Sequence, residues 1–389
     1  MYNDVTVRKV SKHERNISFV QENTPLVIEA SIRSDAAFLE KFLSSHSNEL
    51  LSDIATYGAV LLRGFKIDTV ADFERQLRSI SGFRCIKHIA LAEPGRTLVD
   101  GTEFVFHTNT LIKTGGTRTF GGFHVENYHS PDVPRYVSFF CLKASTFGGE
   151  TGLIDMTKVY SDLPAGLKRE LESRAFITTS VPISAVMERF QMSEANLRRF
   201  CENVGLPIGE RHGELSIRFF KPSVIEHPTT HERALAIDIS NELARKGNFG
   251  RSRVFKADYT GLVWSLYRRS WRRIERQTKP TITSTEQPYS MDNAFVGEIF
   301  SEADCNLIEE SMRRHFSVFS WKRGDILLID NLKMAHGGMP GFGSRNLKLI
   351  MANRVHIPCT DTSGLYCASE NSVETLGAEI LKLLNKSQA

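Results

Sequence analysis

The chain has 389 residues, of which 41% are hydrophobic and 24% are charged, and its formal net charge is +4. These values are typical of a folded globular protein and exclude a disordered, collagen-like or coiled-coil chain. No apolar run approaches the ~20 residues of a membrane span, and the polar N-terminal stretch predicts no signal peptide. We therefore expect a cytoplasmic protein with reduced cysteines, no membrane contact and no nucleic-acid partner.

The N-terminal part of the chain predicts two helices around a short buried strand. Apolar residues recur at helical spacing over residues 34–57 and 70–80, and residues 59–62 are an apolar run of strand length. Further strands are predicted at residues 135–142, 153–156, 215–220, 234–239, 325–329 and 347–355. Short strands with helices between them favour a mainly β fold, a barrel or sandwich with helical insertions.

The domain organisation is predicted to be simple. No linker or repeat marks a boundary, so we expect a single catalytic domain over residues 1–389. Helical insertions are predicted at about 158–210 and 240–280, and a further helix at 301–315. A C-terminal helix at about 372–386 has its apolar residues on one face, so we expect it to dock on the body.

Charge is concentrated in one part of the chain. Residues 245–280 contain eleven Lys/Arg and two acidic residues, a local net charge of +9. A charged helix is most often a solvated face, and the sharper interpretation is a docking surface for an acidic carrier protein or an anionic substrate tail.

The first chemically informative piece contains His124 and Glu126. Residues two apart on a strand point to the same face, so this imidazole and carboxylate can converge on one metal ion. An HxE pair alone is a weak signal, because two polar residues on a solvent-facing strand give the same pattern.

Two further pieces lie near the C-terminal end. An apolar strand at 325–329 is followed by His336, and the two glycines directly after His336 allow close approach of backbone or ligand. Nine residues later, Arg345 precedes a second strand, and an arginine there can make a bidentate contact to a carboxylate. Taken singly, a histidine after an apolar strand is more often a structural residue than a ligand, and a surface ion pair is the alternative role for Arg345.

Taken together, the three pieces indicate a specific chemistry. Two histidines and one carboxylate with open positions are the facial triad of non-haem Fe(II) oxygenases. Three protein ligands leave three positions on octahedral iron, of which a 2-oxo acid takes two and O2 the third. The distal carboxylate of 2-oxoglutarate then needs a cation, which Arg345 can supply.

The same pieces carry a family resemblance. The chain resembles the TauD/TfdA-type Fe(II)/2-oxoglutarate dioxygenases over about residues 55–356, and within them the SyrP-like branch from peptide natural-product pathways. The matching pieces occur in the family's order: residues 58–65, the HxE piece, 134–141, 148–151, 227–230 and 324–345. The resemblance implies a double-stranded β-helix (jelly-roll) core. Departures at residues 106–123 and 338–339 concern the expected substrate pocket and leave the iron site intact.

Roles follow from the resemblance residue by residue. His124, Glu126 and His336 would ligate iron, and Arg345 and Thr151 would hold the distal carboxylate of 2-oxoglutarate. The implied reaction consumes 2-oxoglutarate and O2, releases succinate and CO2, and hydroxylates an unactivated C–H bond. The implied substrate is an amino acid or an amino-acid-derived intermediate, free or carrier-bound.

The iron ligand set also bears on the reaction outcome. Related halogenases have a small residue where this chain has Glu126, and a carboxylate ligand leaves no position for chloride, so hydroxylation is favoured over halogenation. Desaturation, epoxidation or oxidative cyclisation on the same iron scaffold is the alternative. A barrel that binds a ligand without turnover, or a zinc hydrolase, is a third reading, and the sequence has no HExxH helix to support the hydrolase.

Substrate contacts are the least defined part of the prediction. Arg118 has the strand parity of His124, and three other polar residues are candidates: Asn109, Asn127 and Arg354. Each of them also fits a structural or solvent-facing role.

Overall fold

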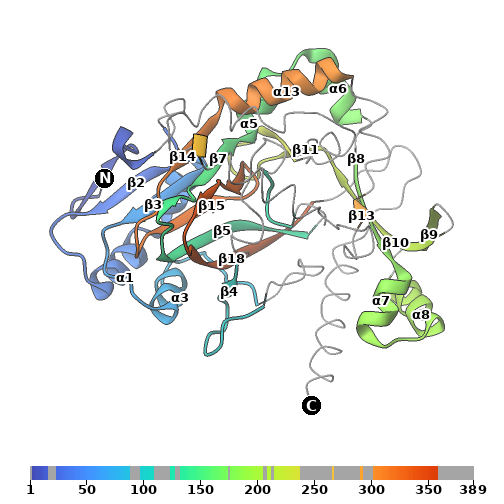
Figure 1. Ribbon diagram of the computed structural model, residues 1–389, viewed down its shortest axis with the longest axis horizontal. Helices are drawn as coiled ribbons and strands as arrows, with labels where there is room; N and C mark the ends of the chain where they lie inside the picture. The colour runs from blue at the N-terminus through green and yellow to red at the C-terminus, as the bar shows by residue number, and fades with distance from the viewer. Residues whose placement is uncertain are drawn as a thin grey trace.

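The protein is strand-rich, with helices on both sides of its sheets (Figure 1). The computed structural model describes residues 2–15, 23–87, 97–108, 123–127, 132–173, 176–204, 208–211, 214–236, 265–266, 290–291 and 301–357. The mainly β prediction with helical insertions is confirmed at this level. Across the described segments, no helix is both long and apolar enough to cross a bilayer.

The largest sheet has seven strands in the order β1-β2-β3-β15-β5-β18-β4. Its strands are β1 (Val5–Arg8), β2 (Leu26–Ala30), β3 (Ala59–Arg63), β15 (Ile326–Asp330), β5 (Asp132–Lys143), β18 (Asn346–His356) and β4 (Phe106–His107). Only the β2–β3 pair is parallel, and the other neighbours are antiparallel. All five residues of β15 are buried, which is expected of a strand at the centre of a sheet covered on both faces.

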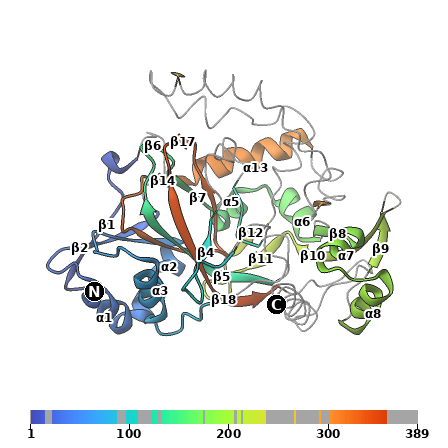
Figure 2. The same ribbon diagram turned by 60° about the horizontal axis from the view of Figure 1, so that its bottom comes forward.

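Three helices cover one face of this sheet: α1 (Ala36–Ser45), α2 (Ser47–Tyr57) and α3 (Val70–Arg78). Figure 2 shows them gathered on one side of the sheet. Their apolar stripes join outward-facing residues of the sheet in one core cluster, to which Leu39, Leu50 and Phe73 contribute fully buried side chains. The predicted helix at 34–57 is divided at His46, a break that periodicity does not reveal because neither Gly nor Pro marks it.

A second, three-stranded sheet packs against the opposite face. It contains β14 (Phe316–Phe319), β7 (Thr151–Asp155) and β16 (Met334–Gly338), all antiparallel. The core cluster between the two sheets combines Phe139 and Leu349 of the large sheet with Leu153, Phe319 and Met334 of the small one. The two sheets therefore form a sandwich, and within the described residues β1 and β4 leave its large sheet open at the edges.

Helices α5 (Met156–Asp162), α6 (Ala165–Ser173) and α13 (Glu302–Arg314) lie on the side away from α1 and α3 (Figure 1). They share a third core cluster with the hairpin of β11 (Val224–Glu226) and β12 (Arg233–Leu235). A short 3-10 helix, η1 (Lys12–Glu14), and a two-residue pairing of β6 (Phe147–Gly148) with β17 (Gly341–Phe342) complete this part.

The predicted insertion at about 158–210 is helical in α5, α6, α7 (Ile183–Phe190) and α8 (Glu194–Val204), but not throughout. It also contains β8 (Phe176–Pro182) and β9 (Ile208–Arg211), which pair with β10 (Glu214–Pro222); β8 also pairs with β13 (Ser290–Met291). The β-branched residues of 177–181 explain β8. Apart from residues 265–266, the predicted insertion at 240–280 lies outside the described residues, as does the C-terminal helix at 372–386.

Candidate metal centre

The structure brings His124, Glu126 and His336 together, although 212 residues separate the two histidines. Their potential ligand atoms all lie within 4.8 Å of one another. Nε2 of His336 is 3.6 Å from Oε2 of Glu126, and the two imidazole centroids are 4.8 Å apart. His336 and Glu126 are buried and His124 is partly buried, so the cluster faces the interior.

The sandwich positions His336. It lies in β16 opposite Leu153 of β7, and its ring contacts Phe139 of the large sheet at a centroid distance of 5.3 Å. His124 is attached to the same strand through its main chain. The His336 N–H donates to the His124 carbonyl at 2.8 Å, and the His124 N–H donates back at 3.1 Å.

Glu126 reaches the cluster in a different way from the one predicted. The HxE piece is not a regular strand: His124 forms an isolated bridge, Glu126 lies in a turn, and Asn127 has a φ of 59°. The strand-parity reasoning was therefore wrong in its geometry, because the turn and not alternation directs the carboxylate inward. The convergence of the three side chains follows from tertiary contacts.

The donor set fits Fe(II). Two imidazoles and one carboxylate, with no thiolate, match the 2-His-1-carboxylate ligation of non-haem iron. Two neighbouring donors at about 2.1 Å from a divalent metal lie about 3 Å apart. The 3.6 Å between His336 and Glu126 is close to this value. Small side-chain rotations would therefore close the three donors around one ion.

Arg345 and Thr151 are brought to the same end of β7. The β6–β17 pairing carries the chain back over residues 147–149, and Arg345 donates from Nη1 to the carbonyls of Gly149 at 2.9 Å and Glu150 at 3.3 Å. Thr151 is buried, and its Oγ1 accepts from Nε1 of Trp321 at 2.9 Å. Burial lowers the pKa of Arg345 to about 10, so the guanidinium stays charged at neutral pH.

The predicted substrate contacts divide into two groups. Asn109 and Arg118 lie outside the described residues, and so does the basic segment at 245–280 apart from residues 265–266. Asn127 is buried directly after Glu126, whereas Arg354 is partly exposed in β18 opposite Pro134. The structure thus places Asn127 beside the triad in sequence and Arg354 on the large sheet.

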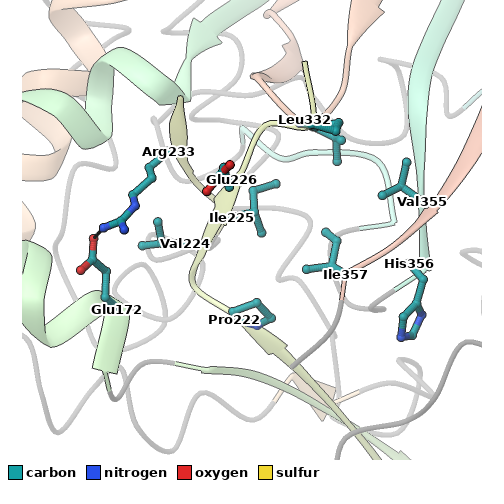
Figure 3. Close-up of a pocket in the computed structure, with 11 residues that line it drawn as sticks. Glu172, Pro222, Val224, Ile225, Glu226, Arg233, Leu332, Val355, His356 and Ile357 are labelled. Atoms are coloured by element: carbon teal, nitrogen blue, oxygen red, sulfur yellow. Dashed lines mark hydrogen bonds and ion pairs between the residues drawn. The ribbon is translucent and has the colours of Figure 1, made fainter. Parts of the chain in front are cut away.

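A separate groove of about 520 Å³ opens beside the β11–β12 hairpin (Figure 3). Its walls are mostly apolar, and Arg233 pairs with Glu172 at one end. The lining residues are Glu172, Pro222, Val224, Ile225, Glu226, Pro228, Arg233, Leu332, Val355, His356 and Ile357. None of these described residues belongs to the triad, so the groove is distinct from the metal centre.

Sequence reasoning gave no role to two buried pairs behind the triad. Asn331 bonds the peptide groups of Glu126, and Oδ2 of Asp330 lies 2.9 Å from Nε2 of the fully buried His227. Asp330 and Asn331 both lie in the family piece at 324–345, and this was the one feature of the sequence that pointed to them. The partners lie 103 to 205 residues away, and no local pattern identifies them.

Comparison with known proteins decides the family. The family model described as "Taurine catabolism dioxygenase TauD, TfdA family" matches residues 22–352. The chain belongs to the TauD/TfdA family. It is a dioxygenase that uses Fe(II), 2-oxoglutarate and O2, and the family implies a jelly-roll core for the sandwich.

Solved structures agree on the fold. A crystal structure of a taurine dioxygenase from Burkholderia xenovorans is similar with a TM-score of 0.50 and 14% identity, covering 97% of this chain and 99% of that chain. A putative alpha-ketoglutarate-dependent taurine dioxygenase from the same organism has a TM-score of 0.51 and 12% identity, covering 96% and 99%. No curated protein sequence matches this chain.

Proposed function

We propose that this TauD/TfdA-family protein hydroxylates an unactivated C–H bond of an amino acid or amino-acid-derived natural-product intermediate, as in the SyrP-like branch. The observation that carries the iron chemistry is the convergence of His124, Glu126 and His336 within 4.8 Å. The balanced reaction is R–H plus 2-oxoglutarate plus O2, giving R–OH, succinate and CO2. The whole chain would act as a single catalytic domain with jelly-roll topology.

The ligand set supports hydroxylation among the outcomes of this chemistry. When bound, Fe(II) with 2-oxoglutarate and O2 supplies the oxidant that attacks the C–H bond. His124, Glu126 and His336 would occupy three positions of the metal and leave the others to 2-oxoglutarate and O2. The Glu126 carboxylate takes the position that a halide would need. Desaturation, epoxidation or cyclisation remains the alternative, because substrate placement decides it.

Arg345 and Thr151 would hold 2-oxoglutarate at its distal carboxylate. A charged guanidinium donates strong hydrogen bonds to a carboxylate, and the Thr151 hydroxyl is free to rotate its proton toward one while accepting from Trp321. The apolar cluster around Phe139, Leu153 and Met334 would exclude water from the metal side of the sandwich.

The substrate is a small molecule, and its attachment to an acidic carrier protein would use the basic segment at 245–280. Asn109, Arg118, Asn127 and Arg354 are the proposed substrate contacts. Charge reversal at Arg268, Arg269, Arg272 and Arg273 should slow only the reaction of a carrier-bound substrate. Equal rates with the variant and the wild type on a carrier-bound substrate would eliminate the docking idea.

The decisive experiment is an anaerobic titration of the protein with Fe(II) and 2-oxoglutarate, followed by its visible spectrum. A weak metal-to-ligand charge-transfer band is expected, and it should be lost in His124→Ala and Glu126→Ala. His231→Asn is the matched control, because it removes an exposed imidazole at a position with a φ of 58°, which Asn tolerates. Candidate amino acids are then tested for succinate release coupled to O2 uptake. Full metal loading without the band would refute 2-oxoglutarate chelation and the role of Arg345.

A further inference from the structure

Asn331 lies at the back of the metal centre, and its side-chain amide is bonded to the main chain of Glu126. Oδ1 of Asn331 accepts from the Glu126 N–H at 2.6 Å, and Nδ2 donates to the Glu126 carbonyl at 3.1 Å. Nδ2 also donates to the Pro134 carbonyl at 2.9 Å. One acceptor facing an N–H and one donor facing two carbonyls fix the orientation of the amide, since the flipped form would oppose like groups.

This contact replaces a strand neighbour. Glu126 lies in a turn, and the Asn331 amide bonds its N–H and carbonyl as the backbone of an adjacent strand would. Asn331 is itself immobilised: it is 1% exposed, and its own N–H donates to the Arg135 carbonyl at 2.7 Å. Both partners are buried, so the amide bonds are shielded from competing water.

The residues before Asn331 anchor it further. Oδ1 of Asp330 accepts from the Leu332 N–H at 3.1 Å, and Oδ2 bonds His227. Nδ1 of His227 accepts from the Thr230 N–H at 3.0 Å, so the Nε2 proton is directed at Asp330. The turn after β15 is thereby held by its side chains as well as by the sheet.

We propose that Asn331 is the positioning residue for the carboxylate ligand. Residues 331–336 would then organise the entire triad: His336 is one ligand, its main chain holds His124, and the Asn331 side chain holds Glu126. This inference rests on the proposed iron site. It assigns the metal affinity in part to an amide that makes no contact with the metal, and substitutions behind metal ligands typically weaken binding by about 10- to 100-fold.

The test is the Fe(II) dissociation constant of Asn331→Asp, measured anaerobically by equilibrium dialysis. The carboxylate keeps the acceptor for the Glu126 N–H but loses the donor to two carbonyls, so we expect Kd to rise by about 10- to 100-fold. Asn353→Asp is the matched control. Asn353 accepts from the Arg84 N–H at 2.7 Å and donates to the Gly82 carbonyl at 2.8 Å, so the same chemical change breaks the same kind of contact on residues outside the triad.

The Kd of the Asn353→Asp control should stay within about two-fold of the wild type. Asn331→Ser retains a hydroxyl donor and acceptor, so its Kd should lie between those of the wild type and Asn331→Asp. A folded Asn331→Asp protein with the wild-type Kd, or a control that weakens binding equally, would overturn the positioning role. Where Asn331→Asp fails to fold, residue-resolved hydrogen exchange of the wild-type apoprotein decides: the Glu126 amide is expected to exchange slowly, and fast exchange would overturn the clamp. If His124→Ala binds Fe(II) with the same Kd as the wild type, the iron site itself is refuted.

Discussion

Breaking the buried ion pair between Arg63 and Asp325 by removing one partner should be among the most destabilising single substitutions in the sandwich. Nε of Arg63 donates to Oδ1 of Asp325 at 3.1 Å, its Nη groups bond Oδ2 of Asp325 and Glu14, and Nη2 donates to the Ser320 carbonyl at 2.8 Å. Both Arg63 and Asp325 are 1% exposed. Replacing Arg63 by Met would remove the cation and leave the Asp325 carboxylate buried.

The expected loss follows from these contacts. Removing one partner of a buried, hydrogen-bonded ion pair costs about 3–5 kcal/mol of unfolding free energy. Glu14 keeps Arg8 as a partner, so most of this loss would come from the Asp325 carboxylate, which stays buried without Arg63. Burial raises the pKa of Asp325 even with Arg63 present, and the loss in Arg63→Met should therefore shrink as the pH falls and the carboxyl is protonated.

Urea unfolding of wild type, Arg63→Met, Asp325→Leu and Arg63→Met/Asp325→Leu measures this loss and the coupling between the two residues. The double variant should recover at least about 1 kcal/mol relative to the sum of the single substitutions, because the residues are coupled. Arg75→Met is the control: Arg75 is 55% exposed beside Asp72, and its loss should cost less than about 1 kcal/mol. A loss in Arg63→Met no larger than in this control, or strict additivity in the double variant, would refute the reasoning.

Three further predictions concern packing, pH and co-substrate binding. Gly152→Ala would place a methyl group 2.7–2.9 Å from three side chains, Phe123 among them, and should lower the unfolding free energy by about 1–3 kcal/mol; an unchanged urea midpoint would contradict this. Burial alone would raise the pKa of Asp162, but hydrogen bonds led by that from Arg314 lower it to about 2. The ionised carboxylate therefore stabilises the protein above about pH 4, and this stabilisation fades toward pH 2. Asp162→Asn should lower the free energy of unfolding by about 1–2 kcal/mol at pH 7. In unfolding measured during acid titration, the difference between variant and wild type should begin to shrink below about pH 4. Arg345→Ala should raise the KM for 2-oxoglutarate about 10- to 100-fold in succinate-release assays, from lost charge-assisted hydrogen bonds, and Arg345→Lys should recover part of it; equal KM values would count against the assignment.

The sequence predicts best the strands that are buried on both faces of the large sheet, because burial makes their residues apolar. Strands β3 and β15 are near-continuous apolar runs, because the sheet is covered by helices on one face and strands on the other, and the buried part of β18 is mostly apolar as well. Strand β8 was missed inside a region of helical pattern, since its stability comes from pairing with β10, 34 or more residues later. The β-branched residues of 177–181 favour a strand locally, but they do not identify the distant strand that pairs with it.

The candidate site shows the same division. Residue types and motif order pointed to His124, Glu126 and His336, and the structure brings them together. The reason given for Glu126 was wrong, because strand alternation requires a ladder that the HxE piece does not have. The Asn331 side chain holds the main chain of Glu126, and a side-chain amide bonded to a backbone 205 residues away leaves no trace in sequence periodicity.

The residues of the family piece at 324–345 have two kinds of role: some lie at the metal centre, and others stabilise the strands around it. Strand β15 lies between β3 and β5 and is fixed at both ends. At its start, Asp325 is bound to Arg63, and at its end, Asp330 is bound to His227. The next residue, Asn331, is therefore delivered at a fixed position relative to the large sheet, and β16 follows with His336. Because β15 is anchored in this way, the buried ion pair at its start helps to fix the position of the triad. Arg63→Met should therefore raise the dissociation constant for Fe(II), measured by anaerobic equilibrium dialysis, as well as lower the free energy of unfolding.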